Sequence, residues 1–153
     1  GMIVTGKHGH SSTIEHIQMQ PDGVPCYCGG RGCMETLLSL TSLLKENETI
    51  DDFFSKVRIK EASALNRWNT FLTDLARAIN MLHLIYDTDF ILGGYIAPYL
   101  CEEDLTFIHE KIQQMTPFAE AQDFLLISKM PKHNITIGAA LPFIQRFLNS
   151  FGI

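Results

Sequence analysis

His16-Ile17-Gln18-Met19-Gln20-Pro21-Asp22-Gly23-Val24-Pro25-Cys26-Tyr27-Cys28-Gly29-Gly30-Arg31-Gly32-Cys33-Met34-Glu35 contains three of the four cysteines of the chain. With His16, the thiols of Cys26, Cys28 and Cys33 supply the donors of a closed tetrahedral zinc site. The glycines of the segment let the backbone turn tightly enough for these side chains to converge. The alternatives are a disulfide or buried thiols without a ligand, but C-x-C is too close for an easy disulfide. The segment therefore predicts zinc.

The same residues resemble the signature of the ROK proteins, the family of repressors, open reading frames and kinases. A histidine is followed by C-x-C-G-x-x-G-C-x-E, and every fixed position of this motif is present. The resemblance implies an actin-like ATPase fold in which the zinc loop shapes a sugar pocket. It also implies that His16 and Glu35 bind sugar; read without the resemblance, Glu35 only complements the dipole of a helix that begins nearby.

One position departs from the pattern of the ROK kinases. Those proteins usually have G-E-I-G-H before the cysteines, with the glutamate contacting sugar, whereas this chain has Ser12-Thr13-Ile14-Glu15-His16, in which Thr13 replaces that glutamate. Thr13 lacks the charge-assisted pair of hydrogen bonds that a carboxylate offers to two hydroxyl groups. Glu15 compensates in part if the backbone here is extended, because Thr13 and Glu15 then lie on the same side. The segment therefore looks more like the ROK transcriptional regulators than the kinases.

Composition indicates one compact domain. The chain has 153 residues, of which 46% are hydrophobic, enough for a single core. Its 12 basic and 17 acidic residues give a net charge of −5, which repels a phosphate backbone, so this segment alone is not expected to bind DNA. No apolar run of membrane-spanning length and no signal-peptide pattern is present, and clustered cysteines with metal spacing fit a reducing compartment. We expect a cytoplasmic protein.

Apolar residues at helical spacing predict several helices. The expected helical ranges are 33–47, part of 48–60, 65–86, 105–115 and 136–149, and Pro142 is expected to kink the last helix or to confine its regular part to one side. A strand is expected over residues 2–5, and buried strands are expected at 90–92 and 124–127. A strand, a helix and a strand in succession predict a parallel crossover.

Several residues of reactive or aromatic type receive a structural interpretation. Trp68 and His83 lie on the apolar face of the long helix and are expected to pack in the core. Cys101 is expected to be a small buried hydrophobe rather than a nucleophile. His8 and His10 fall in an expected exposed loop over residues 7–13 and are more easily explained as solvated side chains than as metal ligands.

Two glycine-containing segments resemble the nucleotide-binding parts of the family. The strand at 90–92 runs into Gly93-Gly94, as in the ROK nucleotide loop, and Gly138 opens a small triplet like the one that packs beside the nucleotide. A plain strand-to-helix turn and a tight helix contact are the structural alternatives. Tyr95 stands where the family's kinases often have a third glycine, which argues against nucleotide binding.

The fold expected is α/β, and the resemblance implies the C-terminal lobe of an actin-like, ribonuclease-H-like fold. Residues 1–153 would form this single lobe, with the zinc loop at 16–35 and the nucleotide-side loop at 93–95. The D-x-G-G-T phosphate segment and the catalytic aspartate of the family's N-terminal half do not occur in the chain, so no activity is expected for it alone. Gly1 is either native or a cloning scar. By the resemblance, we expect a homodimer.

Three functional hypotheses follow from the resemblance. The first is a zinc-containing regulator that senses a sugar or an amino sugar and binds DNA only through an upstream domain. The second is the C-terminal half of an ATP-dependent sugar kinase, in which ATP would bind only to the full-length protein. The third is a lobe that acts solely through association. No hypothesis involves a membrane.

Overall fold

The computed structural model describes residues 6–11, 13–118, 124–129 and 134–152. The strand expected over residues 2–5 lies outside these ranges. Residues 7–10 form an exposed loop, as expected, and His8 and His10 are exposed within it. The described chain continues through a short 3₁₀ helix, η1 (Ile14–His16), into the cysteine-rich loop.

The single helix expected over residues 33–47 is instead two short helices, α1 (Met34–Leu38) and α2 (Leu40–Leu43). Ser39 separates them in an extended conformation, with φ −84° and ψ 162°, and its hydroxyl accepts a hydrogen bond from the Ser42 amide. Serine can cap a new helix in this way as readily as it can continue an old one. The apolar residues do recur at helical spacing, as expected, but the helix is interrupted at Ser39.

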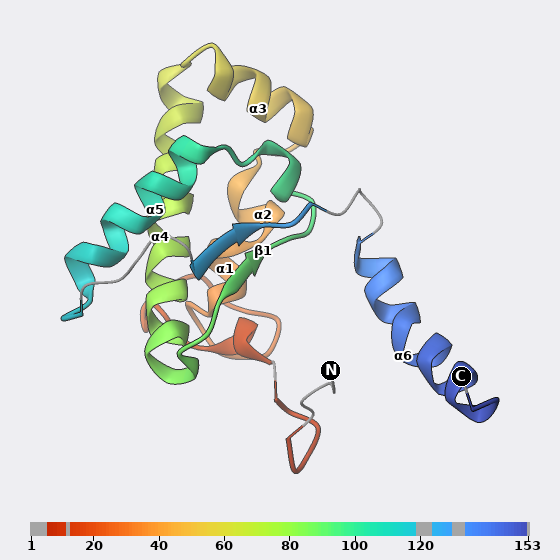
Figure 1. The fold of residues 1–153 in the computed structure, drawn as a ribbon. Coiled ribbons are helices and arrows are strands. Elements are labelled where there is room, and N and C mark those ends of the chain that lie inside the picture. Colours follow the sequence, from red (N-terminus) through yellow and green to blue (C-terminus); the bar gives the residue numbers. More distant parts are fainter. Residues whose placement is uncertain (1–5, 12, 119–123, 130–133, 153) are drawn as a thin grey trace.

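The next two helices match their expected ranges. α3 (Ile50–Arg58) begins with a capping box, in which Thr49 and Asp52 each bond the other's backbone amide. α4 (Ala62–Tyr86) is the longest helix described and ends where Asp87 adopts a left-handed conformation with φ 44°. Figure 1 shows α4 running through the centre of the fold, with α3 at one end and α5 beside it.

The two strands expected from the sequence pair as a parallel crossover. β1 (Phe90–Leu92) and β2 (Leu125–Ile127) align with Ile91 opposite Leu126. The short 3₁₀ helix η2 (Ala97–Tyr99) and the helix α5 (Glu102–Met115) lie between them in sequence. Both strands were expected to be buried, but they are only partly so: Ile91 is 69% exposed and Leu126 is 45% exposed. One face of this sheet therefore packs on the helices and the other is open.

Two apolar clusters organise the interior, and α4 contributes to both. The larger one gathers α3, residues 64–79 of α4, α5 and the strands, and includes Phe53, Trp68, Leu72, Ile108 and Leu125. The smaller one consists of the buried residues Met19, Met34, Ala78 and Leu82. Ala78 and Leu82 of α4 therefore support the segment that surrounds the cysteines, while Ile79 packs in the larger cluster.

Single residues in this core behave partly as expected. Trp68 is buried, and its indole N–H donates to Asp104 at 2.8 Å. His83 is also buried and stacks on Phe124, with ring centroids 4.4 Å apart. Cys101 is exposed rather than buried, because it occupies the N-cap position of α5. Desolvation at that position raises the pKa of Cys101 to about 11, so it is a poor nucleophile all the same.

The last helix, α6 (Asn134–Ser150), departs most from expectation. It continues through Pro142, so the proline does not confine the helix to one side. Its apolar residues were expected to point inward, yet Leu141, Ile144 and Phe147 are 50–62% exposed. Figure 1 shows why: α6 stands apart from the other elements. No described helix is long and apolar enough to cross a membrane.

Candidate metal centre

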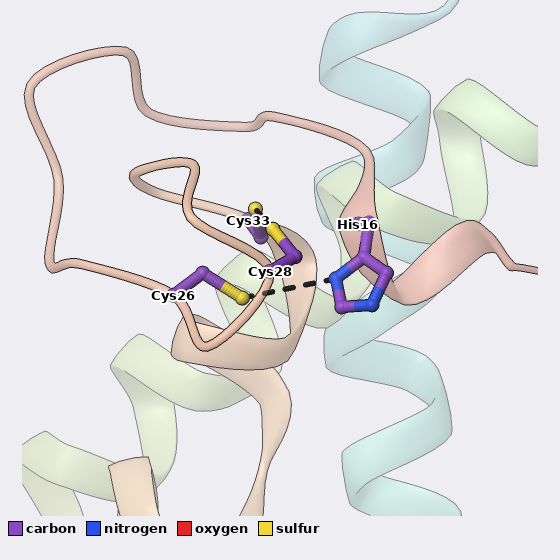
Figure 2. Close-up of side chains that lie close together, drawn as sticks. All are labelled: His16, Cys26, Cys28 and Cys33. Carbon is purple, nitrogen blue, oxygen red and sulfur yellow. Dashed lines mark hydrogen bonds between the residues drawn. The ribbon is translucent and has the colours of Figure 1, made fainter.

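The four side chains expected to bind zinc converge. The ligand atoms of His16, Cys26, Cys28 and Cys33 all lie within 4.8 Å of one another (Figure 2). The Cys26 sulfur is 3.7 Å from His16 Nδ1, and the Cys28 and Cys33 sulfurs are 3.6 Å apart. A tetrahedral zinc ion with Zn–S bonds of about 2.3 Å has ligand atoms separated by about 3.8 Å. The spacing therefore fits zinc, and it is far too long for a disulfide.

The backbone around the cysteines is fixed by hydrogen bonds to Gly32. Its carbonyl accepts from the Met19 and Gln20 amides at 2.8 and 3.0 Å, and its own amide donates to the Val24 carbonyl at 2.8 Å. Gly32 has φ +60°, and a Cβ there would lie only 1.6 Å from the Gln20 carbonyl oxygen. Glycine is required at this position because no side chain fits.

The thiols of the cluster differ in their surroundings. Cys33 is only 2% exposed, and burial raises the pKa of its thiol to about 12. The exposed Cys28 accepts a hydrogen bond from the Gly30 amide at 3.4 Å, which lowers the pKa of its thiol. Zinc binds thiolates, so a bound cation would provide the charge that a buried Cys33 thiolate needs. The donor set thus suits a closed structural site with no open coordination position.

The two nitrogens of His16 face different groups. Nδ1 points toward the Cys26 sulfur, whereas Nε2 lies 3.8 Å from a carboxylate oxygen of Glu15. This arrangement leaves Nε2 on the outer side of the cluster (Figure 2). The ring also meets Tyr27 edge to face, with centroids 5.0 Å apart.

The predicted sugar-binding residues are not all brought together. Thr13 precedes η1 rather than lying in an extended segment, so the condition under which Glu15 would compensate for it is not met. The Thr13 hydroxyl instead donates to the His10 carbonyl at 2.9 Å. Glu35 is half-buried in the first turn of α1 and lines a cavity of about 430 Å³ beside the cysteine loop. Thr13, Glu15 and His16 are not among the described residues that line this cavity.

The predicted nucleotide-binding glycines lie on separate elements. Gly93 and Gly94 follow the carboxyl end of β1, where Gly94 has φ +75°. Gly138 lies within α6, and among the described residues nothing would touch a Cβ added there within 4 Å. The tight helix contact considered for Gly138 is therefore absent from the part of the chain that the structure describes.

Two residues near the cluster were not singled out from the sequence. Tyr27 lines the same cavity as Glu35, and its position between Cys26 and Cys28 was the available signal. Arg77 on α4 donates to the Met19 carbonyl at 3.4 Å and pairs with Asp74 at 3.0 Å. No local pattern links Arg77 to residue 19, because the contact spans 58 positions of sequence.

The sequence is similar to proteins of one known family. The family described as "ROK family" matches residues 1–146. A glucokinase from Thermotoga maritima is 37% identical over 119 residues, covering 63% of this chain and 38% of the glucokinase. The DNA-binding transcriptional repressor Mlc of Escherichia coli is 43% identical over 49 residues, covering 28% of this chain and 12% of the repressor. The chain thus spans less than half the length of either protein.

A solved structure supports the fold. The ROK hexokinase from Thermus thermophilus superposes with a TM-score of 0.70 at 20% identity, covering 83% of this chain and 45% of the hexokinase. At this identity the likeness defines the fold alone, which is the actin-like ATPase fold.

Proposed function

The chain belongs to the ROK family, and from this premise we propose that it is the zinc-containing, sugar-sensing C-terminal lobe of a transcriptional regulator. The convergence of His16, Cys26, Cys28 and Cys33 within 4.8 Å carries the proposal. Zinc would fasten the loop of residues 16–35 and thereby orient the groups beside it. Glu35 lies in the first turn of α1, which directly follows Cys33, so order in the loop fixes its position.

In this proposal His16 has two tasks. Its Nδ1 binds the metal, and its outward Nε2 remains free to meet a sugar hydroxyl or the Glu15 carboxylate. A ligating histidine commonly uses its second nitrogen in this way. Glu35 supplies a carboxylate acceptor for sugar hydroxyls, and Glu15 and Thr13 complete the assigned set. The ligand is a sugar or an amino sugar.

Thr13 favours a regulator over a kinase. Its hydroxyl hydrogen bonds to the His10 carbonyl, so it offers a ligand neither a charge nor a free proton. A protein that only senses sugar needs no catalytic positioning of the reacting hydroxyl. DNA contact would come from an upstream domain, since the chain itself carries a net charge of −5.

A sugar kinase is the second candidate. The observation that favours it is the length of the match to the Thermotoga maritima glucokinase, 119 residues against 49 for the repressor. In that case Gly93 and Gly94 at the end of β1, with Gly138, would lie on the nucleotide side. ATP would then be a substrate of the full-length protein. Tyr95, which is 66% exposed, follows the glycines directly.

One experiment on the full-length protein separates the candidates. Glucose and N-acetylglucosamine are titrated by calorimetry, and ATP turnover and release from operator DNA are measured in parallel. A regulator binds sugar, releases DNA and hydrolyses no ATP. Thr13→Glu is expected to tighten sugar binding by about 10-fold or more, because a charged hydrogen bond to a buried hydroxyl contributes about 1.5–3 kcal/mol. Sugar phosphorylation that is lost in Thr13→Ala would establish the kinase instead.

A further inference from the structure

The three cysteines of the cluster differ in their accessibility to solvent. Cys28 is exposed, whereas Cys26 and Cys33 are 7% and 2% exposed. A dissolved oxidant therefore reaches the sulfur of Cys28 before it reaches either of the others. Zinc binds cysteine as a thiolate, and thiolate character together with exposure determines which cysteine an oxidant attacks. These surroundings make Cys28 the expected point of attack.

A partner sulfur lies next to Cys28. The Sγ atom of Cys33 is 3.6 Å away, so the two sulfurs need to approach by only about 1.5 Å to reach the bond length of a disulfide (Figure 2). Cys26 is a poorer partner, because C-x-C is too close for an easy disulfide and because its own sulfur faces His16 Nδ1 at 3.7 Å. An oxidised Cys28 is therefore expected to react with Cys33.

Residue 30 places no side chain against these two sulfurs. A Cβ added to Gly30 would lie 3.4 Å from the Cys28 sulfur and 3.6 Å from the Cys33 sulfur, which is ordinary van der Waals contact. Gly30 does not have the positive φ of Gly29 and Gly32, so its backbone conformation does not require glycine. An alanine at this position would therefore cover the two sulfurs and still fit the loop.

We propose that Cys28 and Cys33 form a redox switch that releases zinc when a peroxide oxidises the cluster. The Cys28 thiolate attacks hydrogen peroxide, the O–O bond breaks, and Cys28 becomes a sulfenic acid while hydroxide leaves. The Cys33 thiolate then attacks the Cys28 sulfur, so an S–S bond forms, the S–O bond breaks and a second hydroxide leaves. The two thiolates lose two electrons in total, and the peroxide, with two protons, becomes two water molecules. Only His16 and Cys26 then remain as ligands, too few for a closed zinc site.

This inference rests on the zinc of the proposed function and adds a second input to it. Glu35 lies two residues after Cys33, in the first turn of α1. Loss of the metal would loosen the loop that positions Glu35, so the oxidised protein should respond to sugar less than the reduced protein does. The regulator would then read the peroxide level as well as the sugar level.

The test treats the zinc-loaded full-length protein with hydrogen peroxide. Zinc release is followed with a chromogenic chelator, and the disulfide is located by mass spectrometry of tryptic peptides. Trypsin cleaves after Arg31, which separates Cys33 from the peptide that holds Cys26 and Cys28. A bond between Cys28 and Cys33 therefore joins two tryptic peptides, and fragmentation identifies the linked cysteine. We expect this bond together with loss of the bound zinc, and we expect dithiothreitol and added zinc to reverse both.

Two variants sharpen the test. Gly30→Ala should bind zinc as the wild type does when reduced, and should release it several-fold more slowly under peroxide because the methyl group covers the two sulfurs. Cys101→Ser removes the other exposed cysteine, which lies at the N-cap of α5, and should release zinc at the wild-type rate. Sugar binding is titrated by calorimetry before and after oxidation.

The outcomes separate this inference from the proposed function. A zinc-loaded wild type that keeps its metal and its free thiols under peroxide would refute the switch and leave the proposed function standing. A disulfide that involves Cys26 would refute the pairing, and an unchanged rate in Gly30→Ala would refute the role of the open position at residue 30. If zinc release and the disulfide follow the prediction but the reduced protein binds no sugar, sugar sensing fails and the switch stands. A reduced wild type that binds no zinc would overturn both.

Discussion

The Cys28 side chain lies at the surface, whereas Cys26 and Cys33 are buried. Replacing Cys28 by serine therefore leaves no cavity in the core and tests the metal alone. We expect Cys28→Ser to lose most of its zinc and to melt at a lower temperature, because metal binding contributes directly to the order of such a loop. Elemental analysis and thermal unfolding measure the two effects.

Cys101→Ser is the matched control for this prediction. Cys101 is also exposed, but it caps α5 away from the cluster. The Cys101→Ser variant should therefore keep one zinc per chain. An unchanged metal content and melting temperature in Cys28→Ser would contradict the assignment of the site.

Glu48 is the most firmly paired carboxylate described. Its side chain is 5% exposed and accepts from Arg67 at 2.7 and 3.1 Å and from Lys56 at 2.6 Å. Arg67 also donates to the Leu43 carbonyl at 2.8 Å, which joins the end of α2 to α4. The hydrogen bonds from Arg67 hold the pKa of Glu48 well below its usual range.

This pairing makes stability depend on pH. A carboxylate whose folded-state pKa is lowered stabilises the protein fully above its unfolded pKa, about 4.3, and the contribution is lost as the pH falls below that value. Glu48→Gln should cost about 3 kcal/mol at pH 7, since it leaves Arg67 without its charged partner. Urea unfolding at pH 7 and pH 3 should show this difference shrinking in acid. An equal cost at both values would contradict the prediction.

At the scale of elements, the cap of α3 can be tested in isolation. The Thr49 hydroxyl accepts from the Asp52 amide at 3.1 Å, and Asp52 accepts in return from the Thr49 amide at 3.3 Å. Thr49→Ala removes half of this box and should lower the free energy of unfolding by about 1 kcal/mol. Thr49→Ser keeps the hydroxyl and should behave as wild type in the same urea titration. A full loss in the serine variant would show that the threonine methyl group matters instead.

Sequence patterns identified most elements because their signals are local. The period of apolar residues from Leu65 to Leu82 is long enough to define α4 without knowledge of its neighbours. The break at Ser39 was missed, since a serine that caps and a serine within a helix look alike in sequence. The convergence of His16, Cys26, Cys28 and Cys33 could be predicted because spacing and residue type alone constrain such a cluster. The place of Tyr27 beside Glu35 in one cavity was missed because it depends on how the loop folds against α1.

At the scale of the whole molecule, α6 presents an apolar surface that no described element covers. Phe143 is 73% exposed and Phe147 is 62% exposed. Contiguous apolar surface of this kind favours association. We expect the chain to form at least a dimer in solution, and Phe143→Lys with Phe147→Lys to shift it toward the monomer. Light scattering over a range of concentrations measures this.

Gln145→Lys supplies the control for association, because it adds charge to the same exposed helix without removing apolar surface. It should associate as the wild type does. A wild-type chain that stays monomeric at every concentration would contradict the prediction.

The position of α4 in both apolar clusters has a consequence for dynamics. Ala78 and Leu82 are buried against Met19 and Met34, close in sequence to the proposed metal ligands, whereas Ala64 and Leu72 belong to the other cluster. Removal of zinc by a chelator should therefore loosen one end of a single continuous helix and leave the other end closed. Amide hydrogens of residues 81 and 82, which pack in the smaller cluster, should exchange with deuterium faster after chelation, while those of residues 68–72 keep their rate. α4 would then fray from its C-terminal end, so its hydrogen-exchange rates would report whether zinc is bound to the loop of residues 16–35.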